Sequence, residues 1–306
     1  LDVYADMAIN EAAFPVIKGL KSQQEKFAGA VDSYSIEGMM GNSWALQSGT
    51  SHFLGENFAK AFGIQYLDEN NELQYAWTTS WGVSTRMVGG VIMAHGDDQG
   101  LRLPPRIAPI QVVITPIWRT DEEQTLIRSY CTSVEDQLRA VGIRYHVDER
   151  EGLSPGFKFN DWEMRGVPIR IEAGPRDCEN HSVMIARRDV PGKDGKQVVP
   201  VQLLATTTRD LLAEIQANLL KQATEFRDAR LHEAATYDDL KEIVGDGWAL
   251  IWHCGTPECE DRIKEETKAS SRCFPLTENS EWNPKGATCA VCGKPAFGRA
   301  WFSRAY

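Results

Sequence analysis

Two short runs of polar residues carry the side chains best suited to bind a polar ligand. The run from Gln47 to His52 offers an amide, three hydroxyls and an imidazole around one glycine. The run from Thr79 to Arg86 ends in a guanidinium where a helix is predicted to begin, and a helix start favours anions. Arg86 is therefore a candidate clamp for a phosphate, and Gly82 would let a flat group approach the backbone. The alternatives are that Arg86 pairs with a surface carboxylate and that His52 is a core histidine with its hydrogen bonds satisfied.

Four of the seven cysteines form two close pairs with the spacing of a metal site. Cys254 and Cys259 make up one pair, Cys289 and Cys292 make up the other, and about 30 residues separate them. Four thiolates in two such pairs close a tetrahedral zinc site with no open position, which makes the zinc structural rather than catalytic. Four unrelated buried thiols are the alternative, and His253 is a possible substitute ligand beside the first cysteine.

The elements that position the two polar runs follow from hydrophobic periodicity. The sequence predicts a helix over 2–13, a short helix over 55–62, a buried strand over 76–82 and a helix over 84–95. The apolar residues expected to face inward from the last helix are Met87, Val88, Val91 and Ile92. The second polar run thus lies where a strand passes into a helix, which is where open sheets tend to place ligands.

The middle of the chain alternates strands and helices, which indicates a compact α/β domain. The predicted strands are 111–117, 144–147, 168–173 and 182–186, and the predicted helices are 122–141 and 157–165. A long amphipathic helix is predicted at 209–231, and an apolar strand at 248–252 precedes the cysteine pairs. We therefore expect a first domain over 1–108, a second over 109–208, a linking helix within 209–235 and a third domain over 236–306.

Composition excludes several classes of protein. A chain of 306 residues that is 42% hydrophobic and 25% charged is folded and globular, with two or three domains. No apolar run approaches the roughly 20 residues that span a bilayer, and the first residues do not resemble a signal peptide, so a cytoplasmic protein without membrane contact is expected. The net charge of −10 argues against nucleic acid, but residues 1–100 hold 5 basic and 12 acidic residues, whereas 101–306 hold 28 and 31. The later two thirds are nearly neutral and compatible with RNA.

Both polar runs and the cysteine pairs belong to longer motifs, which resemble the class II prolyl-tRNA synthetases that have a zinc-binding C-terminal domain. The run from Gln47 to Phe58 matches the family's Gln-x-Gly-Thr-Ser-His-x-Leu-Gly-x-Asn-Phe pattern. The run from Ser80 to Arg86, which continues through 95–106, resembles the family's version of class II motif 3. The likeness continues through 155–163, 174–177, the cysteine pairs and 304–306, so it covers essentially the whole chain.

The resemblance implies roles for individual residues. The implied contacts with ATP are Gln47, Thr50, Ser84 and Arg86, with Arg86 as the catalytic residue against the triphosphate and magnesium beside it. The implied proline-binding residues are His52, Ser80, Trp81 and Gly82. The implied zinc ligands are Cys254, Cys259, Cys289 and Cys292. Adenylate formation needs mostly alignment of a carboxylate with the α-phosphate and neutralisation of charge, which agrees with these roles.

The α/β block resembles the family's anticodon-binding domain. A few fixed cations would hold phosphates there, and a carboxylate would accept hydrogen bonds from base amino groups. The candidates are Lys158, Glu163, Arg165 and Arg170, together with Arg187 and Arg188 for phosphates. The alternative is that such arginines are only solvated. The resemblance also implies that Tyr306 tucks back toward the catalytic domain, although a frayed terminus is the default for most chains.

The chain departs from the family in lacking motif 1, motif 2 and the upstream element that recognises the proline nitrogen. We therefore expect the C-terminal part of a longer enzyme, inactive alone, whose homodimer forms through the missing part. The implied fold combines a partial antiparallel-sheet catalytic domain, an α/β anticodon-binding domain and a small α+β zinc-binding domain. The implied function is proline–tRNA ligase, which joins L-proline to tRNA(Pro) with ATP. The alternatives are a non-catalytic tRNA-binding or regulatory module and a zinc-stapled structural protein with inert motifs.

Overall fold

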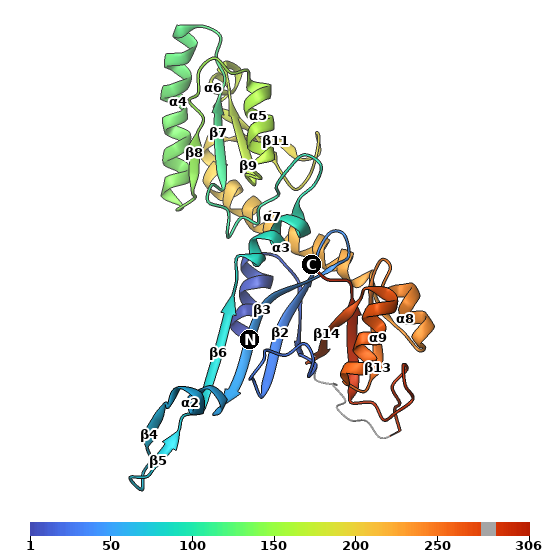
Figure 1. The fold of residues 1–306 in the computed structure, drawn as a ribbon. Coiled ribbons are helices and arrows are strands. Elements are labelled where there is room, and N and C mark those ends of the chain that lie inside the picture. Colours follow the sequence, from blue (N-terminus) through green and yellow to red (C-terminus); the bar gives the residue numbers. More distant parts are fainter. Residues whose placement is uncertain (277–285) are drawn as a thin grey trace. The chain divides into compact units, whose positions relative to one another are not determined.

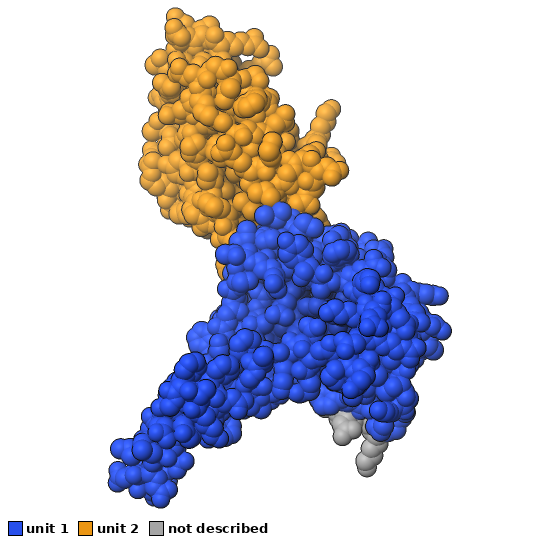
Figure 2. All heavy atoms as spheres, viewed as in Figure 1, with its two compact units in different colours: residues 1–10, 14–94, 224–306 blue, residues 11–13, 95–223 orange. Residues whose placement is uncertain are grey.

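The computed structural model describes residues 1–276 and 286–306, which form two compact units. The first unit comprises residues 1–10, 14–94 and 224–306, and the second comprises residues 11–13 and 95–223 (Figure 2). Within the described ranges, no helix is long and apolar enough to cross a membrane.

An eight-stranded sheet forms the first unit, and it joins the N-terminal third of the chain to the C-terminal block (Figure 1). The strand order is β12-β13-β15-β14-β1-β2-β3-β6. The bounds are β1 Val16–Leu20, β2 Asp32–Met39, β3 Ala45–Gly55, β6 Thr78–Val83, β12 Leu231–Glu233, β13 Trp248–His253, β14 Ser270–Pro275 and β15 Gly298–Ser303. Strand β1 pairs antiparallel with both β14 and β2, so the backbone ladder is continuous between the two segments. Among the described strands of this sheet, β12 and β13 alone pair in parallel.

Short helices and one hairpin complete the first unit. The helices are α1 Asp2–Asp6, continued by a π-helical turn at Met7–Glu11, then α2 Asn57–Phe62, α3 Arg86–His95, α8 Tyr237–Ile243 and α9 Pro257–Thr267. Strands β4 Gln65–Leu67 and β5 Leu73–Tyr75 form a hairpin that extends away from the sheet (Figure 1). Met39 and Ala45 pack with Trp248 and Trp301, so the apolar core also joins the two segments.

Three sequence predictions for this unit are wrong in part. The predicted buried strand corresponds to β6, which is an edge strand that pairs only with β3 among the described residues and is largely exposed. Hydrophobic composition alone does not distinguish an edge strand from a central one. In α3, Met87 is buried as predicted, but Val88 is 61% exposed and Ile92 41% exposed. The predicted first helix ends at Glu11 rather than at residue 13.

A five-stranded sheet forms the second unit, in the order β11-β10-β9-β7-β8. The bounds are β7 Val112–Pro116, β8 Tyr145–Val147, β9 Ile169–Ala173, β10 Ser182–Arg187 and β11 Lys196–Pro200. Strand β7 is parallel to β8 and β9, whereas the other pairs are antiparallel. The helices are α4 Asp121–Ala140, α5 Pro155–Met164, α6 Pro175–Glu179, the 3₁₀ turn Val201–Leu203 and α7 Leu204–Asp228. Residues of α4 and α7 pack with β7 and β9 in one apolar core.

Local sequence signals explain where the helices of this unit begin. The Thr120 hydroxyl accepts a hydrogen bond from the Glu123 amide at the start of α4. Ser154 caps α5 in the same way, and Pro155 occupies the first helical position, where its missing N–H costs nothing. The predicted α/β fold is confirmed, although α6 and β11 were not predicted and the long helix begins at Leu204 instead of residue 209. The domain boundaries at residues 108, 208 and 235 stay a prediction.

Candidate functional site

Three neighbouring strands of the first unit place polar residues on one face of the sheet. Ser33 on β2, His52 on β3 and Ser80 on β6 lie directly opposite one another. Two residues away from His52 on the same strand, Thr50 lies opposite Gly82 on β6. Opposed residues of an antiparallel sheet project to the same face, and so do residues two apart along a strand. The sheet register therefore brings together four of the predicted ATP and proline contacts, two from β3 and two from β6.

A β-bulge brings Gln47 to the same face. The register between β2 and β3 shifts at Ile36 and Glu37, so that Gln47 lies opposite Glu37 and leaves Ser48 unpaired. Glu37 shares its face with Ser35, which donates a 2.7 Å hydrogen bond to the Glu37 carboxylate. In a regular strand, residues three apart project to opposite faces. The one extra residue of the bulge reverses this alternation, so the side chains of Gln47 and Thr50 project to the same face.

A pocket of about 390 Å³ lies over this face of the sheet. Its lining residues are Gln47, Ser48, Gly49, Thr50, His52, Ser80, Trp81, Gly82, Val83, Ser84 and Arg86. The volume is that of a small-molecule site. A Cβ atom built on Gly82 would meet no atom within 4 Å, so the space over this glycine is open. The structure thus gathers all the residues predicted to bind ATP or proline around one pocket.

The Trp81 side chain is the exception within this group. Trp81 lies opposite Ser51, so the strand pleat directs its indole to the face of the sheet opposite His52. The residue is 67% exposed. Trp81 is nevertheless one of the lining residues of the pocket, and its contact with proline stays a prediction.

Arg86 begins α3 at the edge of the pocket. Its amide donates a 3.3 Å hydrogen bond to the hydroxyl of Ser84. Its side chain is exposed, and no ion pair engages the guanidinium within the part of the chain that the structure describes. The alternative that Arg86 is occupied by a surface carboxylate is therefore not supported. A helix start and a free guanidinium together favour an anionic ligand at this end of the pocket.

His52 is held by two residues that the sequence did not indicate. Its Nδ1 atom lies 2.8 Å from the Ser33 hydroxyl oxygen, and the Phe27 ring packs with its centroid 4.9 Å from the imidazole. Burial lowers the pKa of His52, because the charged form loses hydration. Cross-strand contacts such as that with Ser33 leave no local sequence signal. A neutral imidazole with one nitrogen fixed is therefore what lines the pocket.

The chain end lies beside the start of β3. Ala305 forms an isolated parallel bridge with Ala45, and the Tyr306 amide donates a 3.1 Å hydrogen bond to the Ala45 carbonyl oxygen. The main chain of the terminus is thus fastened to the strand that carries Gln47, in agreement with the predicted tucking. The Tyr306 side chain itself is 83% exposed.

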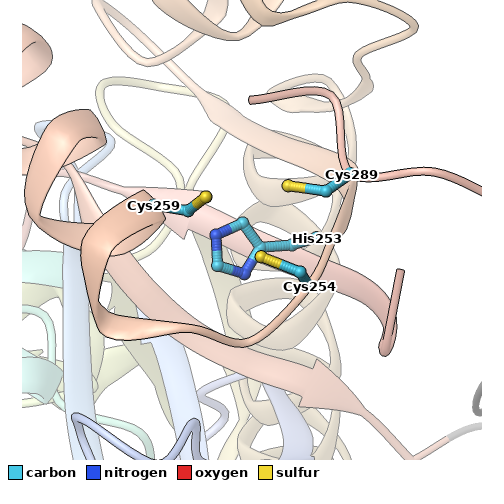
Figure 3. Close-up of side chains that lie close together, drawn as sticks. All are labelled: His253, Cys254, Cys259 and Cys289. Atoms are coloured by element: carbon cyan, nitrogen blue, oxygen red, sulfur yellow. The ribbon is translucent and has the colours of Figure 1, made fainter. Parts of the chain in front are cut away.

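The two cysteine pairs converge in the C-terminal block. Figure 3 shows three of these four cysteines, Cys254, Cys259 and Cys289, together with His253. The ligand atoms of His253, Cys254, Cys259 and Cys289 all lie within 4.8 Å of one another. The Sγ atoms of Cys254 and Cys292 are 3.8 Å apart. A zinc–sulfur distance of about 2.3 Å places the sulfurs of a tetrahedral site about 3.8 Å apart, so this spacing fits bound zinc. Unrelated buried thiols would have no reason to converge in this way.

His253 ends β13 next to the first ligand, and its Nδ1 atom is already engaged. That atom accepts a 3.0 Å hydrogen bond from the Gly255 amide. The side chain is fully buried, and this burial lowers its pKa to about 4. With Nδ1 accepting from the backbone, the neutral ring carries its proton on Nε2, which has no hydrogen-bond partner among the described residues, so the ring would have to lose that proton to bind a metal.

The predicted anticodon contacts are mostly occupied by internal ion pairs. Lys158 is buried, and its Nζ atom donates to the Asp148 carbonyl oxygen at 3.0 Å. Arg170 is buried and contacts the carboxylates of Glu163 and Glu172 at 2.7 and 3.0 Å. The ammonium group of Lys158 is thus held inside the fold by Asp148, and its role in holding phosphates stays a prediction.

Arg165 keeps the most accessible side chain of the four, 55% exposed. Its guanidinium lies 4.8 Å from the centre of the Trp162 ring and 3.2 Å from an Asp161 carboxylate oxygen. Arg187 and Arg188, the other candidates for phosphates, pair instead with Asp189 and Asp97.

Comparisons with known proteins agree on one family. Residues 237–306 match the model "Prolyl-tRNA synthetase, C-terminal", and residues 111–222 match "Anticodon binding domain". The whole chain is 50% identical to a proline–tRNA ligase of Roseiflexus sp. (strain RS-1), of which it spans 62%. It is 48% identical to a chloroplastic/mitochondrial proline–tRNA ligase of Arabidopsis thaliana, of which it spans 56%.

A solved structure extends the likeness to the fold. A prolyl-tRNA synthetase from Cryptosporidium parvum, complexed with L-proline and AMP, matches all of this chain with a TM-score of 0.90 and 38% identity. The chain covers 65% of that structure. The likeness thus covers both units of the fold, and the chain belongs to the prolyl-tRNA synthetases.

Proposed function

We propose that the chain works as part of a proline–tRNA ligase, which activates L-proline with ATP and transfers it to tRNA(Pro). The observation that carries this proposal is the pocket over β3, β6 and the start of α3, which unites Gln47, Thr50, His52 and Arg86. A relative was solved with L-proline and AMP bound, which supports the same ligands here.

The chemistry asks for alignment and charge neutralisation. A carboxylate oxygen of proline attacks the α-phosphorus of ATP, the bond to the bridging oxygen breaks, and pyrophosphate leaves. Gln47, Thr50 and Ser84 hold the nucleotide, and Arg86 neutralises charge on the triphosphate, where magnesium would neutralise more. His52, Ser80 and the open backbone at Gly82 bind proline beside the α-phosphate. The tRNA then takes the prolyl group, and AMP leaves.

The other parts of the chain serve tRNA and stability. The unit that contains residues 111–222 binds the anticodon of tRNA(Pro), with Glu163 and Arg165 as surface contacts, whereas Arg170 orients Glu163. The C-terminal block holds one structural zinc through Cys254, Cys259, Cys289 and Cys292, since closed thiolate sites leave no position for a substrate. A homodimer and a cytoplasmic location remain predictions from the family.

The test is proline-dependent exchange between ATP and pyrophosphate in the complete enzyme. Arg86→Ala should reduce the exchange rate at least a hundredfold, because a charge-assisted contact formed as charge develops is lost. Arg262→Ala, which removes an exposed guanidinium of α9 outside the pocket, is the control and should retain the exchange rate. Normal exchange in Arg86→Ala would contradict the ATP site. Exchange absent from the wild type as well would favour the non-catalytic tRNA-binding module instead.

A further inference from the structure

A buried serine contacts the imidazole that lines the pocket. Ser33 lies on β2 directly opposite His52 on β3, and it is only 1% exposed. Its hydroxyl oxygen accepts a 3.0 Å hydrogen bond from the Phe27 amide and lies 2.8 Å from Nδ1 of His52. The hydroxyl is thus held from both sides, by a fixed backbone donor and by the imidazole.

These contacts determine which ring nitrogen of His52 carries the proton. A buried hydroxyl must donate its own proton to an acceptor, because an unsatisfied donor away from water costs free energy. Within the described residues, Nδ1 of His52 is the acceptor in hydrogen-bonding contact with the Ser33 hydroxyl. Nδ1 must then be unprotonated, so the neutral ring carries its proton on Nε2. The Phe27 amide therefore donates to the Ser33 hydroxyl oxygen, and the Ser33 hydroxyl donates to Nδ1 of His52, which lines the pocket.

The Nε2 proton has no hydrogen-bond partner within the described part of the chain. His52 is half-buried and lines the pocket between Ser33 and Ser80. The Nε2–H group of His52 can therefore bind a ligand atom that accepts a hydrogen bond. Zwitterionic proline offers one kind of acceptor, its carboxylate, because its secondary ammonium group can only donate.

We propose that Ser33 is a positioning residue that fixes His52 as an Nε2–H donor, and that this donor binds the carboxylate of the amino-acid substrate. The ligand assignment depends on the proposed function, whereas the tautomer assignment does not. The contact would hold the carboxylate on the Ser33–His52–Ser80 row of the sheet, in position to attack the α-phosphorus.

The chain offers a matched control on the same strand. Ser35 is also fully buried and lies on the same face of β2, but its hydroxyl donates to Glu37 at 2.7 Å. Ser35→Ala therefore removes a buried hydroxyl without touching His52. Ser33→Thr retains the hydroxyl and should preserve the function of Ser33.

Nitrogen-15 NMR of the chain with labelled histidine, recorded at pH 8, tests the tautomer directly. The His52 signals are assigned by their loss in His52→Gln. The wild type, Ser35→Ala and Ser33→Thr should show a protonated Nε2 and an unprotonated Nδ1, whereas Ser33→Ala should show both tautomers in exchange. A protonated Nδ1 in the wild type, or an unchanged signal in Ser33→Ala, would overturn the proposal whatever the activity of the enzyme.

Kinetics of the complete enzyme test the ligand. Ser33→Ala should raise the KM for proline about fivefold, as expected for one lost hydrogen bond, and leave the KM for ATP unchanged. Ser33→Thr and Ser35→Ala should stay near the wild type. An unchanged proline KM in Ser33→Ala, or equal increases in both KM values, would overturn the assignment to the carboxylate. If the wild type shows no proline-dependent exchange, the proposed function fails while the tautomer result stands.

Discussion

Replacing Glu37 with glutamine should destabilise the first unit more than any exposed substitution. The Glu37 side chain is fully buried and accepts hydrogen bonds from Arg272 at 2.9 and 3.2 Å. Lys21 approaches the same carboxylate at 3.4 Å, and Ser35 donates to it at 2.7 Å. Burial by itself would raise the pKa of Glu37, but the charges of Lys21 and Arg272 outweigh it and lower the pKa. One carboxylate thus contacts two buried cations, one from each of the two chain segments that the sheet joins.

The size of the effect follows from the charges that would remain. Glutamine keeps the shape of Glu37 but removes the charged carboxylate that contacts both Lys21 and Arg272. Removing one partner from a buried ion pair costs about 3–5 kcal/mol of unfolding free energy, a large share of the roughly 5–15 kcal/mol of a typical domain. The exposed pair of Lys18 and Asp2, 2.7 Å apart, is the control, and Asp2→Asn should cost at most about 1 kcal/mol.

Hydrogen exchange at increasing urea measures this cost within the unit. Amides of β2 and β14 should lose about 3–5 kcal/mol of protection in Glu37→Gln, and little in Asp2→Asn. Replacing Lys21, Glu37 and Arg272 together by apolar residues should restore most of the protection, because no buried charge then remains unpaired. A loss below about 1 kcal/mol in Glu37→Gln would refute the reasoning.

The sequence revealed those parts of the site that are local in the chain. The cysteine pairs could be assigned because each pair is a few residues long, so the ligands need only one long-range contact to meet. The polar run from Gln47 to His52 could be found because its residue types are unusual for a strand. Arg86 was correctly placed at a helix start because α3 has a regular apolar pattern.

The parts that were missed depend on contacts across the fold. Ser33 supports His52 only because two strands pair in one register, and Glu37 meets Arg272 from 235 positions away. Lys158 was a candidate for holding phosphates by its residue type, and residue type does not indicate that its ammonium group is buried beside Asp148. Pairing register is what periodicity in one chain segment does not contain.

Two further changes test the metal site and a buried histidine. Cys289→Ser should abolish binding of one zinc per chain, measured by elemental analysis, and lower the thermal stability, whereas Cys178→Ser, outside the cluster, should retain the metal. His95 is buried and donates through Nε2 to the Ala12 carbonyl oxygen at 3.1 Å, and burial lowers its pKa to about 4. Because the folded state favours the neutral ring, its stabilising effect is complete above the unfolded pKa of about 6.5 and is lost as the pH falls toward 4. A pKa shift of this size corresponds to about 3 kcal/mol of unfolding free energy, which the wild type loses as the pH falls from 7.5 to 4. The His95→Gln variant lacks this titrating group, so the unfolding free energy of its second unit should fall by less over the same pH range. Equal losses in urea unfolding would contradict a neutral, buried His95.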